Sequence, residues 1–248
     1  MVYKVVSRLR STAQEVLEPS AGLGFNADLN NSGDDTYVIT GIVAAPRHAG
    51  RFDISVNGDR FAALSLDAIE RLELSVGSDV TDRLPSVLTE AAQLAVYDRA
   101  LNMLAFRARS SSELARALVR KGWDRAHVAA AVARLVEQGF VDDAAFARAY
   151  TRSKVVGANH SKRRVQQDLQ RKGIARDVSD GAIADVFDDE AIDQLALVEA
   201  AARRKLRTLH TLEPRVRQRR LYGFLARRGY DADDIRRAMA TVAAELED

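Results

Sequence analysis

Basic side chains that could bind anions are concentrated in two stretches of this sequence. Ten Lys or Arg residues lie between Arg203 and Arg228, with a single acid among them, Glu213. Arg presents a planar fork of donors that suits phosphate or carboxylate, and a dense basic group attracts polyanions or acidic protein surfaces. The candidate partner-binding residues are Lys162, Arg163, Arg164, Arg171, Lys172, Arg203, Arg204, Lys205, Arg207, Arg215, Arg217, Arg219, Arg220, Arg227 and Arg228.

The charge pattern alone leaves the partner of these residues open. The net charge is only +2, but residues 1–90 hold 8 Lys/Arg against 13 Asp/Glu, whereas residues 91–248 hold 29 against 22. The C-terminal part is therefore mildly basic. A solvated helical face explains such a charge run as well as a binding surface does. If it is a binding surface, phosphate and protein carboxylate fit it equally.

Catalytic chemistry is disfavoured. The chain has no cysteine, which excludes disulfides, thiolate metal sites and thiol nucleophiles. Its four histidines are scattered, and it has neither a phosphate-binding Gly loop nor a nucleophile elbow. We expect the acidic runs Asp142-Asp143 and Asp188-Asp189-Glu190 to cap the helices that follow them rather than to bind a metal. The sequence thus predicts no enzyme, no metal and no cofactor.

A repeat organises the helical part of the chain. Aligned on Gly122, Gly173 and Gly229, three segments share a basic pair before the Gly and a large apolar residue after it. Apolar residues also recur eight and four positions before the Gly, and ten and thirteen after it. The residues eight and four positions before the Gly form the inner stripe of a helix that ends at the Gly, and those ten and thirteen positions after it form the inner stripe of the next helix. With one more helix in front, each repeat has three helices in about 50 residues. Ser110 and Glu113 have the spacing of a capping box at the start of one middle helix.

A helix, a Gly turn and a second helix also match the layout of a DNA-reading helix-turn-helix. The helix after the turn would enter the major groove, yet its first turn is acidic in all three repeats, and phosphates would repel it. Sequence-specific DNA binding is therefore disfavoured. Four aromatic residues fall at inward positions, where we expect core rather than a base-stacking platform: Trp123, Phe140, Phe146 and Tyr150.

A small β element precedes the repeats. Arg51–Val56 alternates polar and apolar residues, and Asn57-Gly58 is a strong hairpin signal. The fold class is mainly α: three tandem three-helix repeats in an elongated array, preceded by a small antiparallel β ribbon and a short helix. The expected segments are a disordered 1–35, a ribbon with helix at 36–88, and repeats at 89–142, 143–190 and 191–248.

Several strings of the sequence resemble the RecX family of recombination regulators. The resemblance covers about residues 37–248, is most specific over 100–190, and has no counterpart for residues 1–36. The loop Gly157–His160 differs from the usual pattern. The strings are Arg109–Leu114 with Lys121-Gly122, Gly139–Asp143 with Phe146-Ala147 and Tyr150, Arg163–Val165 with Leu169 and Arg171–Ile174, and, more loosely, Leu221, Leu225, Arg228–Tyr230 and Ile235.

This resemblance implies a function that composition does not. RecX-like proteins bind the nucleoprotein filament of the RecA recombinase along its groove and dampen its ATPase, strand-exchange and coprotease activities. The expected partner is therefore the RecA–DNA filament, with room for weak binding to single- or double-stranded DNA. Without a membrane span or signal peptide in the sequence, we expect a cytoplasmic protein. We also expect it to be a monomer. Two alternatives stay open: a nonspecific nucleic-acid-binding module and a purely structural scaffold.

Overall fold

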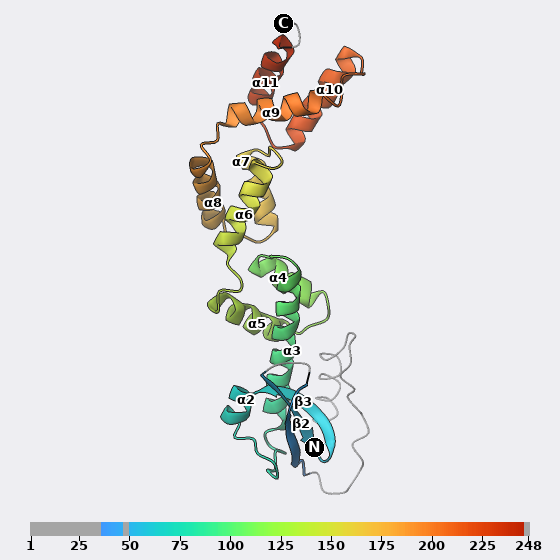
Figure 1. Ribbon diagram of the computed structural model, residues 1–248, viewed down its shortest axis with the longest axis vertical. Helices are drawn as coiled ribbons and strands as arrows, with labels where there is room; N and C mark the ends of the chain where they lie inside the picture. Colours follow the sequence, from blue (N-terminus) through green and yellow to red (C-terminus); the bar gives the residue numbers. More distant parts are fainter. Residues whose placement is uncertain (1–35, 47–49, 246–248) are drawn as a thin grey trace. The chain divides into compact units, whose positions relative to one another are not determined.

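The computed structural model describes residues 36–46 and 50–245 (Figure 1). Residues 1–35, which were predicted to be disordered, lie outside the described residues. Contacts divide the chain into two compact units. Unit 1 comprises the described residues up to Ala108 together with Leu114–Phe140, and unit 2 comprises Arg109–Glu113 together with the described residues from Val141 onward.

Unit 1 contains a three-stranded antiparallel sheet in the order β1-β2-β3. Asn57 and Gly58 both have positive φ, 51° and 91°, which confirms the predicted hairpin between the last two strands. Period-2 alternation directs Ile54 and Val56 to the buried face. The strands are β1 (Ile39–Ala44), β2 (Arg51–Val56) and β3 (Asp59–Ser65).

Two helices follow the sheet in unit 1, α2 (Leu66–Arg71) and α3 (Leu84–Phe106). The hydroxyl of Ser65 accepts a hydrogen bond from Ala68 N and so caps α2. Helix α3 packs against β3 at one end and against α5 further along its length. The sheet thus shares its core with a long helix, as so small a sheet needs for stability.

The described part of the chain has ten helices and one small sheet, which confirms the mainly α fold class. Helices α3 to α5 form the first three-helix repeat, α6 to α8 the second and α9 to α11 the third. The remaining bounds are α4 (Ser111–Val119), α5 (Arg125–Glu137), α6 (Asp143–Val155), α7 (Lys162–Arg171), α8 (Arg176–Asp189), α9 (Gln194–Leu206), α10 (Pro214–Arg227) and α11 (Ala232–Ala244).

The aligned repeat positions have the roles predicted for them. Gly122, Gly173 and Gly229 have φ values of 89°, 80° and 88°, so each turn is left-handed. All six apolar residues eight and four positions before these glycines are buried: Leu114, Val165, Leu221, Leu118, Leu169 and Leu225. Ser110 Oγ also accepts a hydrogen bond from Glu113 N, which confirms the predicted cap of α4.

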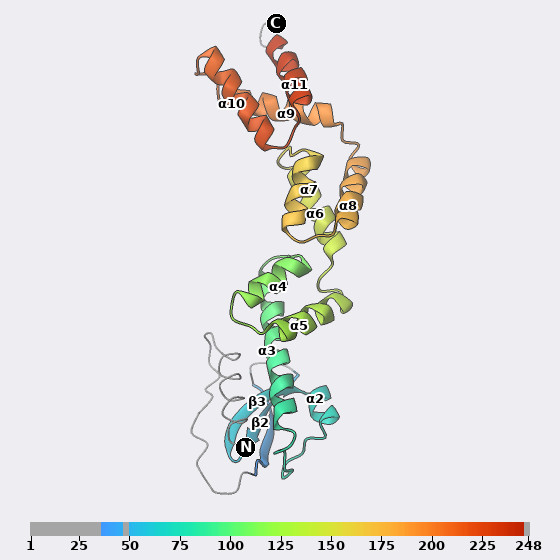
Figure 2. The same ribbon diagram turned by 180° about the vertical axis from the view of Figure 1, so that it is seen from behind.

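One hydrophobic core runs through unit 2 from α6 to α11. Fully buried residues from both repeats belong to it, among them Val165, Leu169 and Leu225. Within the third repeat, α10 and α11 diverge from their shared turn and α9 crosses them (Figure 2). The second and third repeats are therefore fused through side-chain packing and not only through the chain.

Two predictions about individual residues are wrong. Phe140 is 59 % exposed, because the turn at Gly139 places the next residue, Val141, in the buried position instead. The run Asp188-Asp189-Glu190 lies at the end of α8, and Asp193 caps the next helix. In contrast, Asp142 does cap α6, and Phe146 and Tyr150 pack against the core of unit 2.

Candidate partner-binding surface

The fifteen candidate basic residues lie at four places in unit 2. Three open helix α7, whose N-cap is Ser161, and two lie at its C-terminal end. Four lie in the last turn of α9 or directly after it. The other six are on α10 or at its end, with Glu213 as the N-cap of that helix. All of them therefore belong to the second and third repeats.

Ion pairs within unit 2 engage several of these residues near the end of α7. Asp168 accepts from Arg164 Nε and from Arg171 Nη1, each at 3.1 Å. Lys172 Nζ lies 2.8 Å from Glu113 Oε1 and 5.0 Å from the ring centroid of Tyr150. These carboxylates offset the positive charge locally, so this part of the surface offers an acidic partner less attraction.

Arg203 is also engaged within the chain. It lies 3.0 Å from Glu199 and 2.5 Å from Glu245, which pairs the end of α9 with the end of α11. Hydrogen bonding to Arg203 lowers the pKa of the Glu245 carboxyl below its usual range. We infer that Arg203 holds the third repeat together more than it meets a partner.

A groove between α9 and α10 gathers four cations that lack such partners. Its volume is about 370 Å³, and its other lining residues are Leu209 and Gly223. Within the described residues, no carboxylate lies at ion-pair distance from the cationic groups of this groove. Its cations are Lys205, Arg219, Arg220 and Arg227.

Phe224 holds two cations, one of which, Lys205, lines this groove. Lys205 Nζ lies 5.4 Å and the Arg228 guanidinium carbon 4.4 Å from the centroid of its ring. These are cation–π distances, and they hold both side chains along α10. Burial lowers the pKa of Arg228, and the charge of Arg204 acts in the same direction. Arg228 thus serves the interior of the repeat as much as its surface.

The second and third repeats meet at a polar joint that the sequence reasoning missed. Ser161 N donates to Arg228 O at 3.1 Å, and Tyr230 Oη donates to Asn159 O at 2.9 Å. Gly229 lies so close to α7 that an added Cβ would come within 2.6 Å of Arg164 Cβ and of Ser161 Oγ. The turn of the third repeat is therefore seated on the N-terminus of the middle helix of the second.

A related joint lies at the start of α4, in the part of that helix that belongs to unit 2. Ser110 Oγ donates to Lys172 O at 2.6 Å. Ser110 and Ser161 each stand twelve residues before the turn Gly of their own repeat, and both are buried. Each contacts the residue directly before the turn Gly of the following repeat. The Ser at this shared repeat position is the feature of the sequence that could have indicated both joints.

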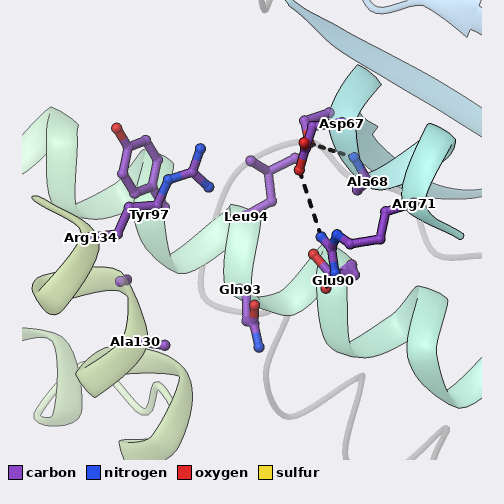
Figure 3. Close-up of a pocket in the computed structure, with 11 residues that line it drawn as sticks. Asp67, Ala68, Arg71, Glu90, Gln93, Leu94, Tyr97, Ala130 and Arg134 are labelled. Carbon is purple, nitrogen blue, oxygen red and sulfur yellow. Dashed lines mark hydrogen bonds and ion pairs between the residues drawn. The ribbon is translucent and has the colours of Figure 1, made fainter. Parts of the chain in front are cut away.

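Unit 1 has a smaller hollow, of about 70 Å³, that contains none of the predicted site residues. Figure 3 shows Arg71 and Glu90 on one side of it and Tyr97 and Arg134 on the other. Arg71 pairs with Glu90 at 2.8 Å, and the Arg134 guanidinium carbon lies 4.8 Å from the Tyr97 ring centroid. Because its charges satisfy one another, we interpret the hollow as a packing seam.

Within residues 36–46 and 50–245, His, Asp and Glu side chains form no group of three that could hold a metal ion. No helix in this range is long and apolar enough to cross a bilayer. His48 lies outside the described residues.

Comparison with protein families decides which family the chain represents. The models of the first, second and third three-helix domains of RecX match residues 97–135, 142–183 and 192–239. The protein named regulatory protein RecX of Halorhodospira halophila is 36 % identical over 158 residues, which are 64 % of this chain and 93 % of the relative. The chain belongs to the RecX family. The corresponding protein of Chlorobaculum tepidum is 34 % identical over 158 residues and 94 % of its own length.

A solved RecX structure has the same fold. The crystal structure of a regulatory protein RecX aligns with a TM-score of 0.66 and 20 % identity, over 82 % of this chain and 99 % of the other. All fifteen basic residues fall within the matches to the second and third RecX domains. The β sheet lies outside the three matched stretches.

Proposed function

We propose that this chain is a negative regulator of the RecA recombinase. It binds the RecA–DNA filament along the filament's groove and inhibits its ATPase, strand-exchange and coprotease activities. Membership of the RecX family supports the choice of partner. Relatives that carry the name regulatory protein RecX agree with a regulatory rather than a catalytic role.

The observation that carries this proposal is the group of basic residues on α10 and at the end of α9. On α10, Arg215, Arg217, Arg219 and Arg220 occupy little more than one and a half turns. No carboxylate of the described chain pairs with any of these four. Four like charges so close together repel one another, and an acidic partner would relieve that repulsion.

The fused core of the second and third repeats supports the same proposal. A shared core and the joint at Gly229 keep α7, α9 and α10 in fixed register. A fixed arrangement loses less conformational entropy when it binds than separately moving helices would lose. Several contacts on one rigid body also favour a repeating polymer over a single subunit, because each further contact is intramolecular.

Charge reversal tests the proposal. Replacement of Arg215, Arg217, Arg219 and Arg220 by Glu should abolish inhibition of RecA ATPase on single-stranded DNA. The helical circular dichroism spectrum should be unchanged, since these side chains face solvent or lie at its border. A matched control replaces Arg148, Arg152, Arg176 and Arg236 by Glu, which alters net charge equally on the carboxylate-paired surface of unit 2. Equal inhibition by the α10 variant and the wild type would refute the proposed surface.

One alternative has a specific observation in its favour. A nonspecific nucleic-acid-binding helical-repeat module would use the same cationic groove between α9 and α10 without any recombinase. It predicts DNA binding that weakens steeply with salt, and no effect on RecA beyond competition for DNA. Excess DNA would then restore ATPase activity fully.

A further inference from the structure

The groove between α9 and α10 brings several unpaired cations together around one hollow. Some other arginines of the unit pair with carboxylates: Arg148 with Asp185, Arg152 with Glu190, Arg176 with Asp180 and Arg236 with Asp233. In the groove, four cations face one hollow, and none has a carboxylate partner within the described residues. Four unpaired cations around one hollow concentrate positive potential there, which favours the binding of an external anion.

Helix geometry makes this anion site linear. Arg219, Gly223 and Arg227 are spaced by four residues, so they lie on one helical face over about 12 Å. Lys205 faces them from α9. A strand of B-form DNA carries about one phosphate per 3.4 Å of axis, and an unstacked single strand spaces its phosphates further apart, so this length spans more than one phosphate. The row of cations therefore fits a chain of phosphates better than a single ion.

Gly223 keeps the middle of this row open. An added Cβ at this position would approach Arg227 Nη1 at 3.3 Å, tighter than an ordinary contact. With no side chain at 223, the guanidinium group of Arg227 has room to lie over the helix backbone at this position. Only Leu209 contributes an apolar side chain to the lining.

This lining favours nucleic acid over an acidic protein surface. Protein interfaces bury an apolar and aromatic centre inside a polar rim, and one leucine does not supply such a centre. Beside the groove, Tyr222 is 41 % exposed and lies three residues after Arg219, on the adjacent part of the helix surface. Exposed aromatic rings next to basic grooves stack unpaired bases.

We infer that the groove between α9 and α10 binds the phosphodiester backbone of a single DNA strand, with Tyr222 stacking on one of its bases. Arg219, Arg220, Arg227 and Lys205 contact the phosphates. The inference rests on the proposed function in one respect, because the groove is part of the basic surface proposed to bind the RecA–DNA filament. The inference assigns the groove to the DNA of that filament rather than to the recombinase. The DNA contact itself needs no recombinase.

The test measures binding of the full chain to a fluorescent oligo-dT by anisotropy, over a series of salt concentrations. The groove variant carries Arg219→Gln, Arg220→Gln and Arg227→Gln. The matched control carries Arg176→Gln, Arg236→Gln and Arg237→Gln, which removes the same charge from other exposed positions of unit 2. Loss of three phosphate contacts should weaken binding about 10- to 100-fold near 0.1 M salt and reduce the slope of log K against log salt by about 2. The control should change affinity less than about threefold.

Tyr222→Ala distinguishes a single strand from a duplex. It should weaken binding to oligo-dT by about fivefold or more, and it should leave binding to a duplex of the same length unchanged. Equal effects on both DNA forms, or none on either, would overturn the stacking assignment. Equal salt slopes for the groove variant and the control would overturn the groove assignment. Displacement of oligo-dT by poly-glutamate as effectively as by unlabelled oligo-dT would show a carboxylate site instead.

A separate measurement keeps this inference distinct from the proposed function. Wild-type protein is titrated into RecA ATPase assays on single-stranded DNA. If the wild type inhibits RecA while groove and control variants bind oligo-dT alike, only the groove inference fails. If the wild type binds oligo-dT through the groove but does not inhibit RecA, the proposed function fails and the groove inference stands.

Discussion

Substitution of Gly229 by Ala tests the joint between the second and third repeats. Gly229 combines a positive φ of 88° with close contact to α7, where an added Cβ would lie 2.6 Å from both Arg164 Cβ and Ser161 Oγ. Gly122, the turn Gly of the first repeat, is the matched control. Its φ is 89°, yet an added Cβ would meet nothing within 4 Å. The two substitutions therefore share the backbone cost and differ in the steric cost.

The expected magnitudes follow from these two costs. A left-handed conformation costs an L-residue about 1–2 kcal/mol, so Gly122→Ala should lower the free energy of unfolding of unit 1 by that amount. At Gly229, the methyl group must also displace the start of α7. Overpacking of this kind costs about 1–3 kcal/mol more, which gives a total of about 2–5 kcal/mol for Gly229→Ala.

Guanidinium chloride denaturation followed by circular dichroism measures both variants. Fluorescence of Trp123, the single tryptophan of the chain, is a useful second probe because it reports on unit 1. Because two compact units can unfold separately, Gly122→Ala is read from the transition of unit 1 and Gly229→Ala from that of unit 2. Equal destabilisation by Gly122→Ala and Gly229→Ala would refute the joint.

Three further predictions concern unit 2. Leu225→Ala removes a fully buried core side chain and should cost about 2–5 kcal/mol in denaturation, against less than about 0.5 for exposed Val156→Ala; equal costs would contradict the assigned core. Tyr230→Phe should cost about 1 kcal/mol by the same assay, through loss of the hydrogen bond to Asn159 O, and no cost would show that the bond is absent. Burial lowers the pKa of His160 below its ordinary 6.5; the charges of Arg228 and Lys154 lower it as well, whereas Asp168 opposes them. The stability of the fold should therefore fall as the pH drops below about 6.5 and level off below the pKa of His160 in the folded state. His160→Asn should flatten this part of the denaturation-midpoint profile, and an unchanged profile would exclude His160 as its source.

The repeat could be predicted because its signals are local. A left-handed Gly turn and apolar residues at −8 and −4 lie within three helical turns, so Gly122, Gly173 and Gly229 align without any knowledge of tertiary contacts. The hairpin at Asn57-Gly58 is local for the same reason. Phe140 was misplaced because its burial depends on how the chain leaves the turn at Gly139, which periodicity does not specify.

The pairing of the basic residues depends on contacts distant in the sequence. Lys172 pairs with Glu113, 59 residues away, and Arg203 with Glu245, 42 residues away. Neither pair follows from charge counting along one helix. Arg164 and Asp168, at i and i+4, are the exception, since that spacing places them side by side on α7.

The groove between α9 and α10 was partly predictable. Its arginines were among the predicted partner-binding residues because they are dense in the sequence. The contribution of Lys205 from another helix, and the role of Gly223 in opening the lining, required the packing of α9 on α10. Density of charge thus indicated the surface, whereas its concave shape came from tertiary structure.

The most direct test of the central claim is ATP hydrolysis by RecA on single-stranded DNA, titrated with this protein at constant, saturating DNA. A regulator of the filament should inhibit hydrolysis at well below one molecule per RecA, and an excess of free DNA should not restore the activity. No inhibition up to equal concentrations, or inhibition that excess DNA removes completely, would contradict the proposal that the chain acts on the RecA–DNA filament.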